Sequence, residues 1–96
     1  MAENTRMRIH VAGRVQGVLF RQSAKVRALE LGLTGWAKNL LDGTVEIIVE
    51  GPKDKADEFV EWAQHGPLLA SVEKADIARE EYKGEFEGFI VREFGF

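Results

Sequence analysis

The chain has 96 residues, with 16 Asp and Glu against 13 Lys and Arg, so its formal net charge is −3 with both histidines neutral. This length predicts one domain with a single hydrophobic core. The absence of Cys excludes a disulfide framework, a thiolate nucleophile and a Cys-based zinc site. The mildly acidic balance argues against a broad basic face that binds nucleic acid.

No apolar run is long enough to span a bilayer, and the start of the chain is polar. These features predict a cytoplasmic protein with no membrane or nucleic-acid partner. Residues 1–5 are expected to form a flexible tail, and residues 6–96 a single domain. The sequence indicates neither repeats nor linkers.

The first half of the chain predicts three strands and a helix. Residues 6–12 alternate between apolar and polar side chains, as in a half-buried strand. Residues 20–31 carry apolar residues at helical spacing, and Gly32 is typical of a helix end. Residues 34–39 and 44–50 read as strands, and Asp42-Gly43 between them predicts a two-residue type I′ turn.

The second half predicts one more helix and two more strands. Asp54 is expected to be the N-cap of a helix whose apolar stripe is Ala56, Phe59, Val60 and Ala63, and Gly66-Pro67 ends it. Extended segments then follow over residues 72–82 and 89–94. The imperfect alternation of the first segment suggests a bulge.

This order predicts an α+β, ferredoxin-like β-α-β-β-α-β sandwich with an additional C-terminal strand. Two helices are expected on one face of an antiparallel or mixed sheet. The additional strand is expected to pair beside the second strand. In this topology the first and second strands are parallel, so their C-terminal ends lie together. Asn39 is therefore expected near the loop that follows the first strand.

That loop, residues 13–19, contains two glycines and leads directly into a helix. Such a loop can turn several backbone N–H groups toward an anion, and the start of a helix adds further donors and a partial positive charge. Arg21, in the first helical turn, offers a planar fork of donors to a phosphate. The spacing matches neither a P-loop nor G-x-G-x-x-G, so the residues alone favour an ordinary turn over an anion site and leave both open.

Two segments resemble the signatures of the acylphosphatase family: Gly13-Arg14-Val15-Gln16-Gly17-Val18-Leu19-Phe20-Arg21 and Gly35-Trp36-Ala37-Lys38-Asn39-Leu40-Leu41-Asp42-Gly43-Thr44-Val45-Glu46. They occur in the family's order, and residues 31–36 and 51–52 are also similar to it. Three positions depart from the pattern: Leu19, Ala37 and Leu41. None of the departures removes a functional group.

The resemblance implies an enzyme that hydrolyses acyl phosphates to a carboxylate and inorganic phosphate, with no metal and no cofactor. Arg21 and Asn39 are the implied catalytic residues: Arg21 holds the phosphoryl group, and Asn39 orients the attacking water. The implied phosphate-binding residues are Val15, Gln16, Gly17, Val18, Leu19, Phe20 and Arg21. Because a carboxylate is a good leaving group, the reaction needs no protein acid to protonate it. The chain is expected to act as a monomer.

Two other functions stay open. The same fold and loop could serve as a non-catalytic regulatory module that binds an anion or carbamoyl phosphate. The open face of the sheet could bind RNA, but Glu87 precedes the Gly88-Phe89 segment where an RNA-recognition strand has a basic residue.

Other residues are assigned structural roles. Arg14 is expected on the loop surface, and neither His10 nor His65 is given a role. The acidic run over residues 76–87 is expected to be a solvated edge. Four aromatic residues are expected in the core: Trp36, Phe59, Trp62 and Phe89.

Overall fold

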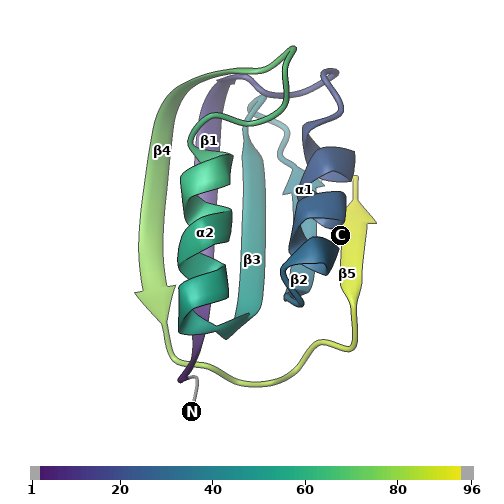
Figure 1. Cartoon of the computed structure of the whole chain (residues 1–96). Coiled ribbons are helices and arrows are strands. Elements are labelled where there is room, and N and C mark those ends of the chain that lie inside the picture. The colour runs from purple at the N-terminus through teal and green to yellow at the C-terminus, as the bar shows by residue number, and fades with distance from the viewer. Residues whose placement is uncertain (1–2, 94–96) are drawn as a thin grey trace.

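The computed structural model describes residues 3–93, and in that range it consists of two helices packed on one face of a five-stranded sheet (Figure 1). The elements in chain order are β1 (Asn4–Arg14), α1 (Phe20–Glu30), β2 (Thr34–Asn39), β3 (Val45–Pro52), α2 (Lys53–Ala63), β4 (Ser71–Glu80) and β5 (Phe89–Arg92). No helix in this range is long and apolar enough to cross a membrane. The predicted α+β ferredoxin-like sandwich is confirmed.

The strand order is β4-β1-β3-β2-β5, with β1 antiparallel to both β3 and β4. Strand β2 is antiparallel to β3, so β1 and β2 are parallel and end at the same edge of the sheet. Strand β5 pairs parallel to β2, beside it as expected. This topology brings the β1–α1 loop and the β2–β3 turn to one end of the molecule (Figure 1).

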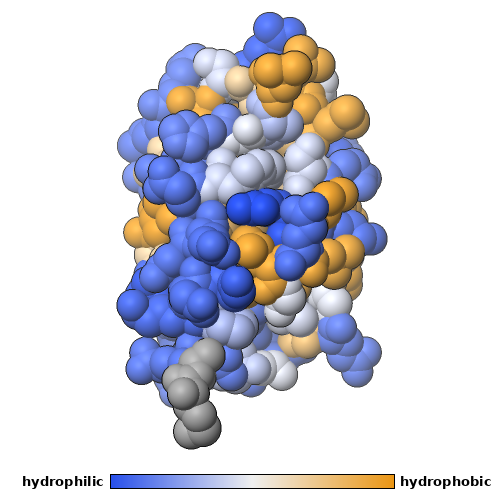
Figure 2. All heavy atoms as spheres, in the orientation of Figure 1, coloured by the Kyte–Doolittle hydropathy of each residue, from blue (hydrophilic) through white to orange (hydrophobic). Residues whose placement is uncertain are grey.

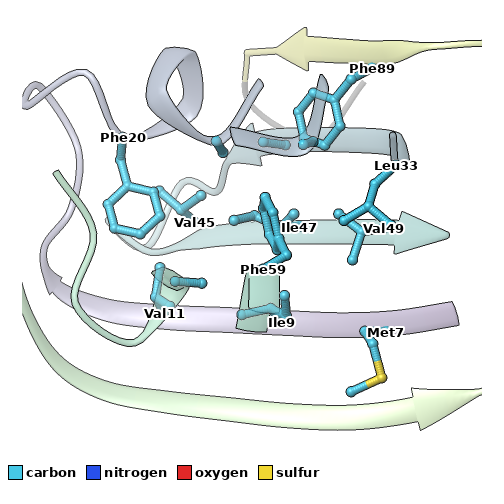
Figure 3. Packing of buried hydrophobic residues seen from close by; sticks show 14 of the residues in the cluster. Met7, Ile9, Val11, Phe20, Leu33, Val45, Ile47, Val49, Phe59 and Phe89 are labelled. Carbon is cyan, nitrogen blue, oxygen red and sulfur yellow. The ribbon is translucent and has the colours of Figure 1, made fainter. Parts of the chain in front are cut away.

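The hydrophobic core fills the space between the helices and the sheet. Phe59 of α2 lies over the middle of the sheet, among Ile9 of β1 and Ile47 of β3 (Figure 3). Phe20 covers the end of the core nearest the β1–α1 loop, and its ring contacts Trp62 with 5.4 Å between centroids. Seen from the helix side, pale and apolar side chains show between hydrophilic flanks (Figure 2).

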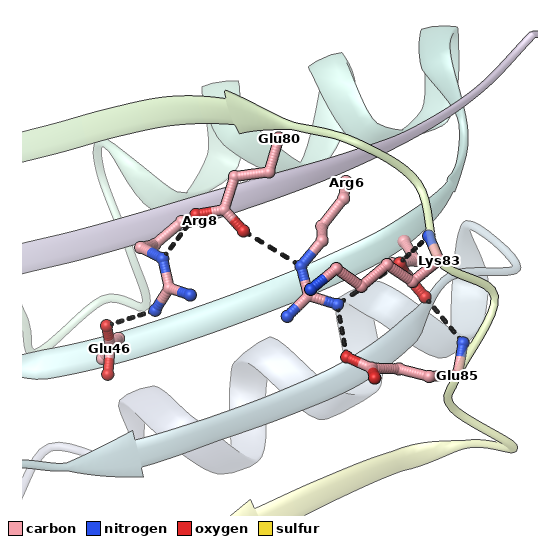
Figure 4. Close-up of polar contacts among 7 residues, drawn as sticks. Arg6, Arg8, Glu46, Glu80, Lys83 and Glu85 are labelled. Atoms are coloured by element: carbon pink, nitrogen blue, oxygen red, sulfur yellow. Dashed lines mark hydrogen bonds and ion pairs between the residues drawn. The ribbon is translucent and has the colours of Figure 1, made fainter.

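The opposite face of the sheet has no helix over it and is covered by charged side chains. Arg6 of β1 is buried there with Glu50 of β3, which is only 1% exposed. Arg6 also bonds to Glu80 and Glu85, and Arg8 bonds to Glu46 and Glu80 (Figure 4). Trp36 was expected in the core, but it lies on this charged face. It alternates with the buried residues of β2, as Lys38 does, and Lys38 and Arg92 contact its ring.

The first strand begins at Asn4, two residues before the expected start of the domain at residue 6. Asn4 and Thr5 belong to β1 and pair with Pro52 and Gly51, and Thr5 is buried. The carbonyl oxygen of Glu3 also accepts a hydrogen bond from the backbone N–H of Lys53, at 2.7 Å. The expected tail over residues 1–5 therefore does not include Asn4 and Thr5, and Met1 and Ala2 lie outside the described residues.

Residues 40–44 connect β2 and β3. The N–H of Leu40 donates to the carbonyl of Thr44, so the loop that this bond closes has three residues, 41–43, and is not the predicted two-residue type I′ turn. Gly43 has a positive φ of 92°, but Asp42 does not, and the N–H of Gly43 donates to the carbonyl of Leu40. Asp42 accepts hydrogen bonds from the N–H and the hydroxyl of Thr44, which hold the pKa of the Asp42 carboxyl below its ordinary value. A single left-handed glycine after a tight turn is the usual geometry of a three-residue hairpin loop.

Two further boundaries differ from the prediction. Helix α2 begins at Lys53 after an N-cap at Pro52, so Asp54 lies in the first turn and not at the cap. There its negative charge still interacts favourably with the helix dipole.

The bulge in β4 is confirmed, because the register with β1 shifts between Ala12 and Gly13. Strand β4 ends at Glu80, and the expected end of the last strand at Phe94 lies outside the described residues.

Candidate active site

The β1–α1 loop curls tightly before the helix. Gly17 has a positive φ of 72°, and Leu19 also adopts the left-handed conformation, with φ 64° and ψ 25°. A leucine in this region costs about 1 to 2 kcal/mol relative to ordinary backbone, and such strain is concentrated at functional sites. Val15 and Val18 are buried below the loop and anchor it to the core. The loop backbone therefore arches over the first turn of α1.

Asn39 is the last residue of β2 and faces the helix side of the sheet. Gly35 and Ala37 precede it on the same buried face, so strand alternation carries its side chain inward, beneath the β1–α1 loop. Asn39 is 6% exposed, and its Oδ1 is buried without a hydrogen-bond partner among the described residues. An unsatisfied buried acceptor is rare in proteins, which makes this amide a candidate functional group.

A pocket of about 190 Å³ joins the loop and Asn39. Of the predicted site residues, the structure brings six together around this pocket: Val15, Gly17, Leu19, Phe20, Arg21 and Asn39. Gln22 completes its lining. The parallel arrangement of β1 and β2 thus places Asn39 beside the loop, as the topology predicted.

Two of the predicted residues do not line the pocket. The Val18 side chain is in the core. The Gln16 amide nitrogen donates to the carbonyl oxygens of Leu40 and Thr44, at 2.8 and 2.9 Å, and so ties the loop to the β2–β3 turn next to Asn39. Nothing in the local sequence pattern around Gln16 indicates this side-chain role, because both of its partners are backbone atoms more than 20 residues away.

Arg21 lies at the edge of the pocket, in the first turn of α1, with its side chain 24% exposed. Its Nη1 donates to the carbonyl of Arg92 at 2.6 Å and to Oε2 of Glu93 at 2.9 Å. Both partners follow or end β5, a strand far from Arg21 in sequence. Sequence reasoning did not identify Glu93, because only the pairing of β5 with β2 brings it near α1.

Three other residues stay apart from the pocket. Arg14 is exposed at the end of β1. His10 lies on the other face of the sheet, where its Nε2 is 2.8 Å from the hydroxyl of Thr44. His65 is exposed and lies 3.6 Å from the Glu61 carboxylate. The sequence pattern assigns no role to either histidine, and neither of them lines the pocket.

Comparisons with known proteins agree with this geometry. The model of the acylphosphatase family matches residues 7–91. An acylphosphatase of Pyrobaculum islandicum is 49% identical over 90 residues, which cover 93% of this chain and 95% of that protein. The structure of an acylphosphatase from Coxiella burnetii superimposes with a TM-score of 0.87 at 38% identity, and the match covers 93% of each chain.

A third comparison is with part of a larger protein. The structure of HypF from T. kodakarensis matches with a TM-score of 0.78 at 34% identity, over 91% of this chain but only 12% of that one. The family match covers most of the chain, and the acylphosphatases of Pyrobaculum islandicum and Coxiella burnetii are matched over 95% and 93% of their lengths. This chain belongs to the acylphosphatase family.

Proposed function

We propose that this chain hydrolyses acyl phosphates by direct attack of water on the phosphoryl group, with the β1–α1 loop and Arg21 as the phosphate site and Asn39 as the residue that positions the water. Hydrolysis of acyl phosphates follows from membership of the acylphosphatase family. The roles of the individual residues are the new part of this proposal. The observation that carries it is the pocket that Arg21, the loop and the buried Asn39 amide share.

The phosphoryl group would be held mainly by the loop backbone. Residues 15–20 pass through two left-handed positions, Gly17 and Leu19. Such a backbone can turn successive N–H groups toward one concavity. The unpaired N–H groups at the start of α1 add donors and about half a positive charge. Arg21 supplies a full charge at the edge of the same pocket. This set can neutralise the phosphoryl oxygens as charge moves in the transition state.

Asn39 is suited to orient the water because its amide offers both an acceptor and two donors. The Oδ1 atom is buried and has no partner in the described part of the chain, so a water in the pocket can donate to it. An uncharged amide cannot remove a proton from water at neutral pH. It acts by holding the water in line with phosphorus, which contributes through proximity and orientation.

The chemistry then balances without a protein base. Water attacks phosphorus, the bond from phosphorus to the carboxyl oxygen breaks, and RCO-OPO₃²⁻ and H₂O give RCOO⁻ and H₂PO₄⁻. Both protons of the water end on the released phosphate. The carboxylate leaves unprotonated because the pKa of its conjugate acid is only about 4. The proposal assigns no step to a metal or a cofactor.

The first test is hydrolysis of benzoyl phosphate by the purified chain in excess chelator, followed by ultraviolet absorbance. We expect turnover in the wild type. For Asn39→Ala we expect kcat to fall roughly 100-fold while inhibition by inorganic phosphate stays nearly unchanged, because the water is positioned only for the transition state. A matched control is Asn4→Ala, an exposed asparagine at the far end of β1.

The outcomes separate the alternatives. Equal loss of turnover and of phosphate inhibition in Asn39→Ala would place Asn39 in the phosphate site instead. Activity that disappears with chelator would contradict the metal-free reaction. Phosphate binding without any turnover by a folded wild-type chain would favour the non-catalytic regulatory module.

The expected cytoplasmic location and monomeric state are also part of this proposal. A monomer is supported by a site that one chain assembles from its own loop, helix and strand. Sedimentation equilibrium at micromolar concentration measures the oligomeric state directly. A stable dimer would contradict it.

A further inference from the structure

A second hollow lies next to the phosphate pocket, on the outer side of the helix layer. It is a groove of about 360 Å³ between α1 and the end of α2. Its lining from α1 and its N-cap is Leu19, Gln22, Ser23, Val26, Arg27 and Glu30, and from α2 and the segment after it Trp62 and Pro67. Figure 2 shows pale and apolar side chains between the two helices, where this groove runs.

The groove is an exposed apolar surface with a rigid wall. Leu19 is 70% exposed and Val26 is 59% exposed, although both are aliphatic. The Trp62 ring opposite them is fixed by contacts with Phe20 and Phe59, at 5.4 and 5.5 Å between centroids. A fixed aromatic wall facing exposed aliphatic side chains is the composition of a small-molecule site.

The groove adjoins the phosphate pocket. Leu19 and Gln22 line both hollows, so these two residues form their common border. Asn39 lines only the phosphate pocket. Because the attacking water and the leaving group must be nearly in line through phosphorus, the acyl group has to extend away from Asn39. The groove borders the phosphate pocket, and Asn39 is not among the residues that line it.

The charges in the groove indicate which acyl group fits. Arg27 and Glu30 are its charged residues, and their side chains lie 3.5 Å apart as an ion pair. The groove therefore has no net charge to offer a second anionic group. We infer that it is the acyl subsite of the enzyme and that it favours acyl phosphates with an uncharged, extended apolar acyl group. This inference rests on the proposed phosphate site.

The test compares two substrates and two variants. Acetyl phosphate is too short to lie along the groove, whereas hexanoyl phosphate extends toward Val26, about 10 Å along α1 from Leu19. Val26→Ser removes an apolar contact in the groove. Leu29→Ser is the matched control, because Leu29 is also an aliphatic residue of α1, 54% exposed, but lies outside the groove. Loss of acyl phosphate is followed by trapping the remainder with hydroxylamine.

We expect the wild type to have a higher kcat/KM for hexanoyl phosphate than for acetyl phosphate. In Val26→Ser we expect kcat/KM for hexanoyl phosphate to fall roughly tenfold, and for acetyl phosphate to stay within about twofold, since a lost apolar contact affects only the substrate that makes it. Leu29→Ser is expected to leave both substrates within about twofold.

Two results would overturn the acyl subsite and leave the phosphate site intact: equal rates for the two substrates in the wild type, or equal effects of Val26→Ser and Leu29→Ser. Failure of the wild type to hydrolyse either substrate would instead overturn the proposed function, and the acyl subsite with it. The two failures are therefore distinguishable in one set of assays.

Discussion

Arg6 and Arg21 both contact carboxylates, but the chain holds them in opposite ways. Arg6 is 6% exposed and bonds to three carboxylates, those of Glu50, Glu80 and Glu85. Arg21 is partly exposed at the edge of a pocket, and both contacts that the described residues give it use the single nitrogen Nη1. Arg6 therefore has little capacity for a ligand, whereas Arg21 keeps donors for one.

Their surroundings distinguish a structural role for Arg6 from the proposed phosphate-binding role of Arg21. Around Arg6, several acidic side chains neutralise the charge and one of them, Glu50, also binds backbone N–H groups of Lys83 and Glu85 (Figure 4). Around Arg21, backbone N–H groups and a helix start add to the positive potential. Only the second environment attracts an anion. Substitutions in the two environments should therefore have different effects on activity and on stability.

Arg21→Ala should lower kcat/KM for benzoyl phosphate by about 10³-fold or more, since an arginine that stabilises transferring phosphoryl groups contributes 10³ to 10⁵ in rate. The fold should survive, because the lost contacts lie at the surface. Enzyme kinetics and urea unfolding of the same preparation measure both effects. Arg14→Ala, at the exposed end of β1 just before the loop, is the matched control, with activity within about twofold of wild type. Unfolding of Arg21→Ala in mild denaturant would contradict the assignment.

Glu50→Ala should have the opposite profile: a loss of about 3 kcal/mol in the free energy of unfolding, with near-normal turnover by the molecules that stay folded. The substitution leaves Arg6 short of a buried partner and removes the acceptor of two backbone N–H groups from the segment before β5. Urea unfolding measures the loss. Glu81→Ala, at an exposed carboxylate of the same segment, is the control and should be nearly neutral.

A Glu50→Ala variant with wild-type stability but reduced turnover would contradict the structural role given to the charged cluster around Arg6. It would mean that the charged face of the sheet contributes to catalysis and not to folding. The same variant therefore tests whether stability and activity reside in separate parts of this small domain.

Much of the arrangement of the candidate phosphate site was predictable from local sequence. Alternation predicted β1, and the order of the elements predicted the topology in which β1 and β2 are parallel. This is enough to place Asn39 next to the β1–α1 loop. The glycines and Arg21 predicted where an anion site would lie. These features can be predicted from a single sequence, because they depend on neighbouring residues and on a common topology.

The remaining features depend on contacts between distant segments. Trp36 was expected in the core because it was assigned to the buried period of its strand. The buried residues of β2 are instead Gly35, Ala37 and Asn39, so strand alternation turns Trp36 to the opposite face. Glu50 is buried because the segment before β5 crosses the open face of the sheet and binds it. Strand periodicity contains no signal for such a crossing.

The stability that Arg6 and Arg8 provide should weaken in acid through Glu80. Hydrogen bonds from Arg8, and then from Arg6, hold the pKa of the Glu80 carboxyl below its ordinary value. A lowered folded-state pKa stabilises the protein above the unfolded value, about 4.3, and this contribution is lost as the pH falls through the lowered pKa. Urea midpoints between pH 7 and pH 3 should therefore fall less steeply in Glu80→Gln than in the wild type. Glu81→Gln, the control, should keep the wild-type slope.

The smallest expected effect concerns Glu93, which is the one carboxylate that contacts Arg21 among the described residues. Its Oε2 competes with a phosphate for Nη1 and adds a negative charge near the site. In Glu93→Gln the Arg92 carbonyl still holds Nη1, so the guanidinium keeps its position while the repulsion disappears. Because exposed ion pairs contribute at most about 1 kcal/mol, the inhibition constant for inorganic phosphate should fall only two- to threefold at low salt.

Glu87→Gln, which removes the same charge elsewhere, is the control. Weaker phosphate inhibition in Glu93→Gln would show that Glu93 positions Arg21 instead of competing for it, and Arg21 would then resemble Arg6 more closely than its open surroundings suggest.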